Sequence, residues 1–188
     1  MENLRSIFVL IVVLFATASP ALSKERKLKP PKKDSNGIEW YNYEAGWEKA
    51  KAENKHMFVD FTATWCVWCK RLELNTFSQP QVLKALTEDF VPVKVWEKSP
   101  DTLEIDGYRI TEIDLRKREF RATSFPQLWF VSPKGTRIGP IRGFVQAEQL
   151  MQYLDIVRTY AYDSTLDESG NPINQSEESD GTGDSREP

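Results

Sequence analysis

The chain has 188 residues, of which 40% are hydrophobic and 12% aromatic, and this is enough for the core of one domain but not of two. Its formal net charge of −3 is small, and no stripe of basic residues interleaved with aromatic ones runs along the sequence. The composition therefore argues against nucleic acid as a partner and predicts one globular domain with extensions.

The first 23 residues resemble an export signal in composition. Arg5 precedes an apolar segment at residues 7–16, and residues 21–23 offer a cleavage site before Lys24. The apolar segment is short for a bilayer span. We therefore expect an exported protein, with the bacterial periplasm as the simplest location. An uncleaved membrane anchor and a eukaryotic secretory route remain alternatives.

The two ends of the remaining chain differ sharply in composition from its middle. Residues 24–37 are rich in lysine and proline and have little to bury, which predicts a basic linker that is mobile. Residues 163–188 carry one basic and eight acidic side chains among Ser and Gly, which predicts a disordered acidic tail. The folded domain is accordingly expected at residues 38–162.

Helices are predicted where apolar residues recur at helical spacing, and strands where they form short runs or alternate. In chain order, the pattern predicts a helix at 43–54, a strand at 58–61, a helix from Cys66, a helix at 80–88 and a strand at 90–96. A helix at 112–120, strands at 127–132 and 136–143, and a helix at 146–162 follow. Trp47 is expected to face the core from the first helix.

Local signals refine three of these elements. Ser78 is predicted to cap the helix at 80–88 and Thr111 the helix at 112–120. Residues 103–105 and 108–110 alternate in polarity around Asp106-Gly107, a favoured two-residue turn, so they predict an inserted hairpin. The last helix is expected to bury one apolar face, which consists of Leu150, Leu154, Val157 and Ala161.

The two cysteines of the chain, Cys66 and Cys69, follow the strand at 58–61 directly. Two intervening residues bring their sulfurs within one helical turn, which suits a small-loop disulfide, and unpaired N–H groups at the helix start stabilise a thiolate at Cys66. A disulfide that closes so short a loop adds little stability. The cysteine pair is therefore more typical of a reactive site than of a structural disulfide. Its spacing also fits half of a zinc site.

Several residues around the cysteines together resemble the thioredoxin superfamily over residues 38–162. They are Asp60 six positions before Cys66, Trp65 and Lys70 beside the cysteine pair, and Phe125-Pro126 before the strand that follows the third helix. The resemblance implies an α/β, thioredoxin-like three-layer fold, in which helices flank a central mixed sheet. The inserted hairpin is an addition.

Two subgroups of the superfamily are especially similar. Residues 47–55, 58–61 and 76–83 resemble the thioredoxin-like C-terminal domain of transmembrane thiol:disulfide interchange proteins, and residues 142–144 with the hairpin resemble SoxW-like periplasmic thioredoxins. The chain departs from many thioredoxins at Thr62, where they have Trp, and between the cysteines, where Val67-Trp68 replaces Gly-Pro. The substrate and the reduction potential therefore do not follow from the resemblance.

The cysteine pair and Asp60 are the expected catalytic residues. Cys66 should be the exposed attacking thiolate, and Cys69 should resolve the mixed disulfide from within the helix. Asp60, buried beneath Cys69, should titrate high because of desolvation and could accept the Cys69 proton. A structural, hydrogen-bonded Asp60 is the alternative. Lys94 on the neighbouring strand is a candidate ion-pair partner for Asp60, or an ordinary surface lysine.

The expected substrate-binding residues are Trp65, Trp68, Phe125 and Pro126. By resemblance the Phe125–Pro126 peptide bond is cis, which exposes the backbone of Phe125 for pairing with a client strand. Trp65 and Trp68 would form an apolar rim around the cysteines, unless they are merely packed.

Three classes of function compete. The first is a protein-disulfide oxidoreductase, expected to be monomeric and to need no cofactor beyond its redox-active disulfide. It would reduce client proteins and draw on an upstream dithiol donor, for which a membrane thiol:disulfide interchange protein is a candidate. A disulfide-forming oxidant or an isomerase is the alternative within this class.

The second and third classes are a metal carrier and a redox-inactive interaction module. Carriers of this fold need a further histidine, and His56 is expected to be a surface residue upstream of the central strand. Because the chain has no second cysteine pair either, a zinc or copper site would be incomplete. We expect no metal. Val67-Trp68 places no cation between the cysteines, which favours a reductant over an oxidant.

Overall fold

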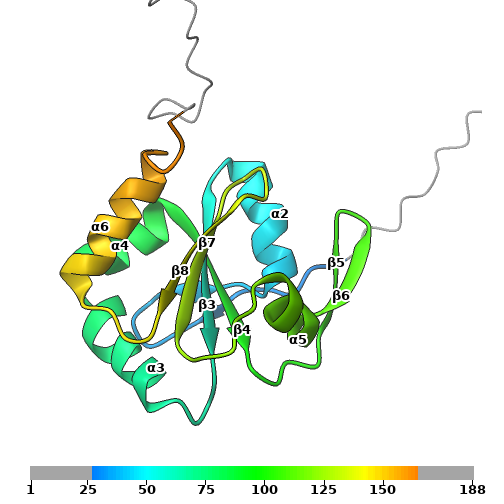
Figure 1. Cartoon of the computed structure of the whole chain (residues 1–188), viewed down its shortest axis with the longest axis horizontal. Coiled ribbons are helices and arrows are strands. Elements are labelled where there is room, and N and C mark those ends of the chain that lie inside the picture. Colours follow the sequence, from blue (N-terminus) through cyan, green and yellow to red (C-terminus); the bar gives the residue numbers. More distant parts are fainter. Residues whose placement is uncertain (1–26, 165–188) are drawn as a thin grey trace, which may run out of the picture.

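A computed structural model describes residues 27–164. The expected signal at 1–23 and nearly all of the acidic tail lie outside the described residues. Within them a four-stranded mixed sheet has the order β4-β3-β7-β8 (Figure 1). Its strands are β3 (His56–Thr62), β4 (Phe90–Trp96), β7 (Gln127–Val131) and β8 (Arg137–Arg142). β3 runs parallel to β4 and antiparallel to β7.

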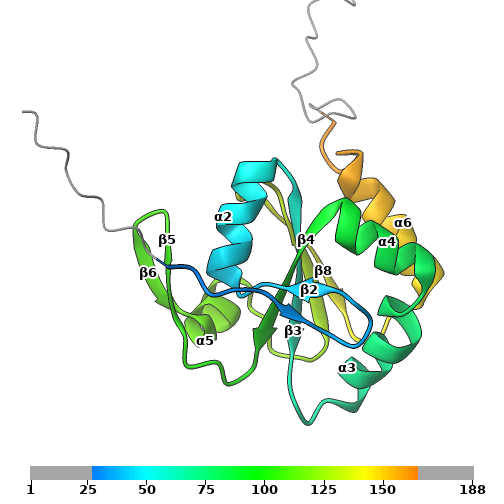
Figure 2. The same cartoon turned by 180° about the vertical axis from the view of Figure 1, so that it is seen from behind.

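Helices cover both faces of the sheet (Figures 1 and 2). They are α2 (Tyr43–Glu53), α3 (Val67–Leu72), α4 (Pro80–Glu88), α5 (Glu112–Asp114) and α6 (Ala147–Arg158). One-turn π-helical segments, η1 (Glu73–Phe77) and η2 (Leu115–Glu119), extend α3 and α5. The predicted α/β architecture of three layers around a mixed sheet is confirmed.

Side chains of β3 point alternately to the two faces of the sheet and contribute to two apolar clusters, one on each face. Phe58 joins the apolar cluster under α3, α4 and α6, whereas Met57, Val59 and Phe61 join the cluster under α2 and α5. Because successive side chains of a strand point to opposite faces, Asp60 lies on the Phe58 face, toward α3. The carboxyl group of Asp60 is therefore directed toward the helix that carries Cys69, not toward α2 or α5.

The first helix packs closely on the sheet. Asn42 begins α2 by accepting a hydrogen bond from the Ala45 amide at 2.9 Å, and Asn54 ends it in the left-handed conformation with φ of 51°. A Cβ atom on Gly46 would lie only 2.2 Å from a methyl group of Val93. Glycine therefore permits this approach to β4, and Trp47 is buried as predicted.

The inserted hairpin is confirmed as β5 (Thr102–Ile105) and β6 (Tyr108–Thr111), which pair antiparallel. Asp106 and Gly107 at its turn both have positive φ, 49° and 82°, as a two-residue hairpin turn requires. Thr111 then caps α5, since its side chain accepts a hydrogen bond from the Asp114 amide. That predicted cap is also confirmed.

Regular structure begins earlier than predicted. A short strand, β1 (Lys32–Lys33), lies inside the segment 24–37 expected to be a mobile linker, and it pairs with β2 (Glu39–Trp40). Asp34 holds the loop between them, because its carboxylate accepts hydrogen bonds from the Ile38 amide at 2.9 Å and from Trp40 Nε1 at 2.7 Å. Hydrogen bonds to two buried residues therefore order a strand, β1, that is itself exposed.

Two further local predictions are wrong. Ser78 does not cap α4, which begins after Gln79 without a side-chain cap; the Ser78 hydroxyl bonds instead to the Leu74 carbonyl at 2.5 Å. The last helix ends at Arg158, so Ala161 is exposed and does not share the buried face of Leu150, Leu154 and Val157. None of the helices within residues 27–164 has the length and apolarity of a membrane span.

Candidate functional site

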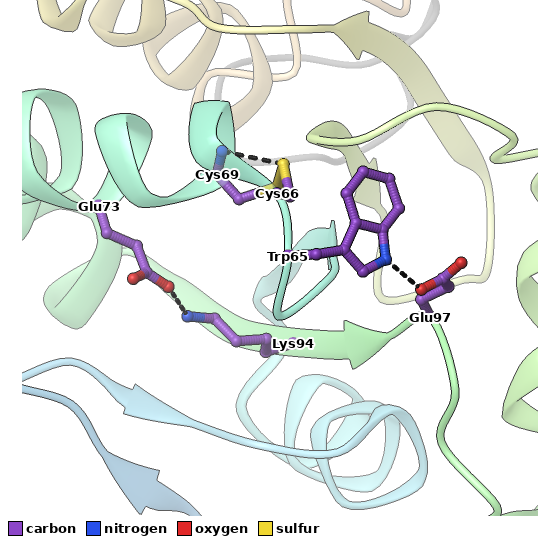
Figure 3. The surroundings of a disulfide bond; sticks show 6 residues. All are labelled: Trp65, Cys66, Cys69, Glu73, Lys94 and Glu97. Atoms are coloured by element: carbon purple, nitrogen blue, oxygen red, sulfur yellow. Dashed lines mark hydrogen bonds and ion pairs between the residues drawn. A yellow bond between two sulfur atoms is a disulfide. The ribbon is translucent and has the colours of Figure 1, made fainter.

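The two cysteines form a disulfide at the start of α3, at one end of the sheet (Figure 3). Their Cα atoms are 5.3 Å apart, and Cys66 Sγ accepts a hydrogen bond from the Cys69 amide at 3.0 Å. Both residues are buried, with 3% and 4% of their surface exposed. The prediction of an exposed Cys66 is therefore wrong for this oxidised state, because Ala63 and Phe125 pack against the disulfide.

Asp60 lies in the middle of β3, opposite Lys94 of β4 and Leu128 of β7. The residue is 1% exposed, and its Oδ1 atom has no hydrogen-bond partner among residues 27–164. Burial raises the pKa of Asp60 from 3.8 to about 7, although the charge of Lys94 opposes this shift and that of Glu73 reinforces it. A carboxyl group with this pKa can exchange a proton at neutral pH.

The ammonium group of Lys94 has a different partner from the one predicted. Its Nζ atom lies 2.6 Å from Oε1 of Glu73, at the start of η1, and its side chain is only 8% exposed (Figure 3). The same ammonium lies 4.3 Å from the centre of the Trp40 ring. Lys94 is thus neither a surface lysine nor the direct partner of Asp60. It influences Asp60 through space.

The loop before β7 lies beside the disulfide. The Phe125–Pro126 peptide bond is cis, and the Phe125 ring contacts the cluster that contains both cysteines. Trp65 meets Phe125 edge to face, with ring centres 5.9 Å apart. The structure therefore places Phe125 beside the disulfide and Trp65 against Phe125, and both are residues expected to bind a client.

Two tryptophans flank the disulfide and are exposed, as a client-binding rim would require. Trp65 is 63% exposed, and its Nε1 atom donates a 2.7 Å hydrogen bond to Glu97 (Figure 3). Trp68 is 51% exposed, and the guanidinium of Arg71 lies 4.7 Å from its ring centre. Each ring thus makes a polar or charged contact while about half or more of its side chain stays exposed.

His56 is buried, contrary to the prediction of a surface residue. It is 3% exposed at the start of β3, and its Nε2 atom lies 2.8 Å from the Tyr162 hydroxyl. Burial lowers the pKa of His56 to about 4, so the ring is neutral at physiological pH. It lies at the opposite end of β3 from Cys66, and no group of three His, Cys, Asp or Glu residues suited to a metal occurs within residues 27–164.

Sequence reasoning missed three contributors to the site. Glu73 follows Cys69 by one helical turn, so its spacing along α3 could have marked it as facing the same strand as Cys69. Glu97 comes directly after β4, and only the tertiary structure places it beside Trp65. Phe144 packs near Trp68, with ring centres 6.0 Å apart. No local sequence pattern predicts this contact.

A family model described as a thioredoxin-like domain matches residues 43–158. The chain is 37% identical over 68 residues to human spermatogenesis-associated protein 20, a match that covers 35% of this chain and 9% of that protein. It is 27% identical over 103 residues to the thiol:disulfide interchange protein DsbD of Neisseria meningitidis, which covers 54% of this chain and 15% of that protein. The chain thus spans less than a fifth of the length of these curated relatives.

Among solved structures, a thioredoxin from Thermus thermophilus is similar with a TM-score of 0.53 and 24% identity, covering 63% of this chain and 85% of that chain. Together with the family match, this likeness confirms the predicted thioredoxin-like fold. It carries no information about the substrate.

Proposed function

Because the chain belongs to the family of thioredoxin-like domains, we propose that it is a protein-disulfide oxidoreductase whose Cys66 and Cys69 alternate between disulfide and dithiol. The observation that supports this proposal is the disulfide itself, which two exposed tryptophans flank and which follows a strand whose buried Asp60 carboxyl group has a pKa of about 7. A structural disulfide would need neither of these neighbours.

In the proposed reductive half-reaction, the Cys66 thiolate attacks one sulfur of a client disulfide and the other client sulfur leaves as a thiolate. Cys69 then attacks Cys66 Sγ in the mixed disulfide, and its proton passes to the Asp60 carboxylate. The second client sulfur leaves. The client gains two electrons and the Cys66–Cys69 disulfide forms again, so an external dithiol must reduce it before the next cycle.

Each step has a physical basis in the site. The Cys69 amide that now donates to Cys66 Sγ would also stabilise a thiolate there. Asp60 lies on the face of β3 that is directed toward α3, and burial keeps its proton affinity near neutrality. Phe125, Pro126, Trp65 and Trp68 would hold the client chain beside the sulfurs.

We further propose that the physiological direction is reductive, in an exported protein supplied by a membrane dithiol donor. The pair between the cysteines, Val67-Trp68, provides no cation that would stabilise the reduced form strongly. The leader composition of residues 1–23 and the similarity to DsbD support export and such a donor. A disulfide-forming oxidant or isomerase is the alternative within the same chemistry.

Two measurements test this proposal. Full-length protein should catalyse reduction of insulin disulfides by dithiothreitol, and Cys66→Ser should abolish the activity. A glutathione titration of the Cys66–Cys69 couple should give a reduction potential of roughly −270 to −200 mV, the range of reducing members of the fold. A potential near about −120 mV, typical of strong oxidants, would reverse the proposed direction.

A further inference from the structure

A groove beside Trp65 extends from the loop that precedes Cys66 to the N-terminal segment. It has a volume of about 420 Å³, and we call it the Lys–Trp groove after four of its residues, Lys32, Trp65, Trp96 and Lys98. One wall is the segment before β1, and the other is the loop that follows β4 (Figure 2 shows both segments). Of the residues that line it, the proposed reaction uses only Trp65, as part of the client-binding rim.

Specific contacts hold the two walls of the groove in place. The ammonium of Lys29 bridges its two walls by pairing with Asp101 at 2.5 Å. The β1–β2 pairing and the Asp34 carboxylate fix the N-terminal wall. A second hollow of about 380 Å³ adjoins it and shares Lys29, Lys32, Trp96 and Asp101. An extended chain could therefore continue from Trp65 along this surface.

The groove carries a net positive charge, because three lysines, Lys29, Lys32 and Lys98, line it together with only two carboxylates, those of Glu97 and Asp101. Glu97 accepts the Trp65 indole hydrogen bond, and Asp101 pairs with Lys29. Lys32 and Lys98 are exposed and have no acidic partner within residues 27–164. All charged side chains at residues 27–33 are lysines, but Lys29 is paired with Asp101, so Lys32 and Lys98 are the lysines of the groove that can attract an anion.

The apolar part of the groove is aromatic and lies next to the reacting sulfur. Trp65 immediately precedes Cys66, and Trp96, 42% exposed, ends β4 opposite Thr62. Exposed tryptophans are the side chains that most often anchor protein interfaces. The groove therefore begins one residue away from Cys66, whose sulfur would form the mixed disulfide with a client.

We propose that the Lys–Trp groove binds an extended acidic segment of the client that flanks its reactive cysteine. Trp65 and Trp96 contact the backbone and apolar side chains of this segment, while Lys32 and Lys98 pair with its carboxylates. The groove thereby selects acidic clients for the disulfide exchange proposed above. The selection of clients rests on the proposed oxidoreductase function. Binding of an acidic segment to the groove needs no redox step.

The test is a binding titration with two labelled linear peptides that lack cysteine and differ only by Glu or Gln at two positions around a central Tyr. Fluorescence anisotropy with oxidised full-length protein should show the Glu peptide binding about threefold to tenfold more tightly, as two partly screened ion pairs allow. The preference should shrink at high salt. The double substitution Lys32→Glu/Lys98→Glu should abolish it.

A matched control changes the net charge equally but outside the groove. Lys84→Glu/Lys117→Glu, on α4 and η2, should retain the wild-type preference at equal ionic strength. Equal binding of both peptides by wild-type protein, or an equal loss in the control variant, would overturn the proposal. So would tighter binding of a single-stranded oligonucleotide of the same charge, because the groove would then select phosphates.

A catalytic readout separates this inference from the proposed function. Disulfide-bridged versions of the two peptides should differ in kcat/KM by the same factor, whereas a small neutral disulfide should be reduced equally by wild-type protein and Lys32→Glu/Lys98→Glu. If no disulfide is turned over, the proposed oxidoreductase function is refuted. The binding titration would still show whether the groove binds acidic segments. Turnover without peptide preference would refute only the groove.

Discussion

Lys94 Nζ lies 2.6 Å from Glu73 Oε1, beneath the helix that carries Cys69. The ion pair engages the charge of Lys94, so Asp60, which faces the same helix, is not directly neutralised. Burial therefore dominates and raises the pKa of Asp60 to about 7. The arrangement leaves a buried carboxyl group that can be either protonated or ionised at neutral pH.

Asp60→Asn should slow the release of the mixed disulfide much more than its formation at pH 7 to 8. The amide cannot accept the Cys69 proton, whereas attack by Cys66 does not need Asp60 in the proposed scheme. Loss of a positioned proton acceptor lowers the rate by about 10²-fold to 10⁴-fold. Rapid-quench measurements of the two steps with a disulfide peptide would separate them.

The wild-type release rate should rise with pH around 7, as Asp60 becomes ionised, and Asp60→Asn should lose this rise. If both steps and their pH profiles stay unchanged, Asp60 has only a structural role.

Cys69→Ser should accumulate mixed disulfides with clients, and Cys66→Ser should accumulate none. Attack by Cys66 survives in the first variant, but no second sulfur remains to release the client. Non-reducing gels and mass spectrometry of the purified variants would detect the adducts. Equal trapping by the two variants would show that Cys69 can also attack and that the assigned order is wrong.

Asp60 and His56 should affect the pH dependence of stability in opposite directions. The folded-state pKa of Asp60 is raised above its unfolded value, so its contribution lowers the free energy of unfolding as pH rises from about 4 to 7. The folded-state pKa of His56 is lowered to about 4, so stability is lost as pH falls from 6.5 toward 4. Wild-type stability should change little across this window.

Single substitutions should expose the two slopes. Asp60→Asn should gain stability relative to wild type as pH rises through this window, by about 2 to 4 kcal/mol in total, and His56→Gln should lose the acid-side decline of about 2 kcal/mol. Urea unfolding at several pH values between 4 and 8 measures both. Parallel curves for wild type and both variants would contradict the shifted pKa values.

Much of the fold could be predicted because local patterns coincide with burial. Strand β4 follows a run of apolar residues, and hairpin β5–β6 follows alternation in polarity around a turn dipeptide. Both signals depend only on neighbours in sequence. The ordered segment at β1 escaped prediction because its stability comes from the Asp34 carboxylate and from pairing with β2. Lysine-rich composition alone does not reveal such capping.

For the site, sequence identified the residues but not their partners. Asp60 was placed correctly on a buried strand by its apolar neighbours, and its raised pKa follows from that burial. The pairing of Lys94 with Glu73 depends on how α3 crosses the sheet, and the burial of His56 depends on Tyr160 and Tyr162, which fold back from beyond α6. Contacts between residues so far apart in the chain produce no periodic pattern in the sequence from which they could be predicted.

The C-terminal boundary of the domain lies a few residues beyond the end of α6. The segment after α6 returns to β3, where the Tyr162 hydroxyl lies 2.8 Å from His56 Nε2 and the Tyr160 ring lies 4.6 Å from the His56 ring. A chain ending at Ser164 keeps both contacts. Because residues 165–188 add only Leu166 and Ile173 as large aliphatic side chains, their removal should change Tm by no more than about 1 to 2 °C.

A chain ending at Arg158 should behave differently, although it retains all of α6. It loses the hydrogen bond to His56 and the two aromatic contacts, at a cost of about 2 kcal/mol, which corresponds to a decrease in Tm of roughly 5 to 10 °C. Tyr162→Phe should lose only the hydrogen-bond share, about 1 kcal/mol. Thermal unfolding followed by circular dichroism would rank the three proteins. Equal Tm values for the chains ending at Ser164 and Arg158 would show that the Tyr160–Tyr162 segment contributes nothing to folding, whereas a large loss at Ser164 would place the domain boundary farther along the chain.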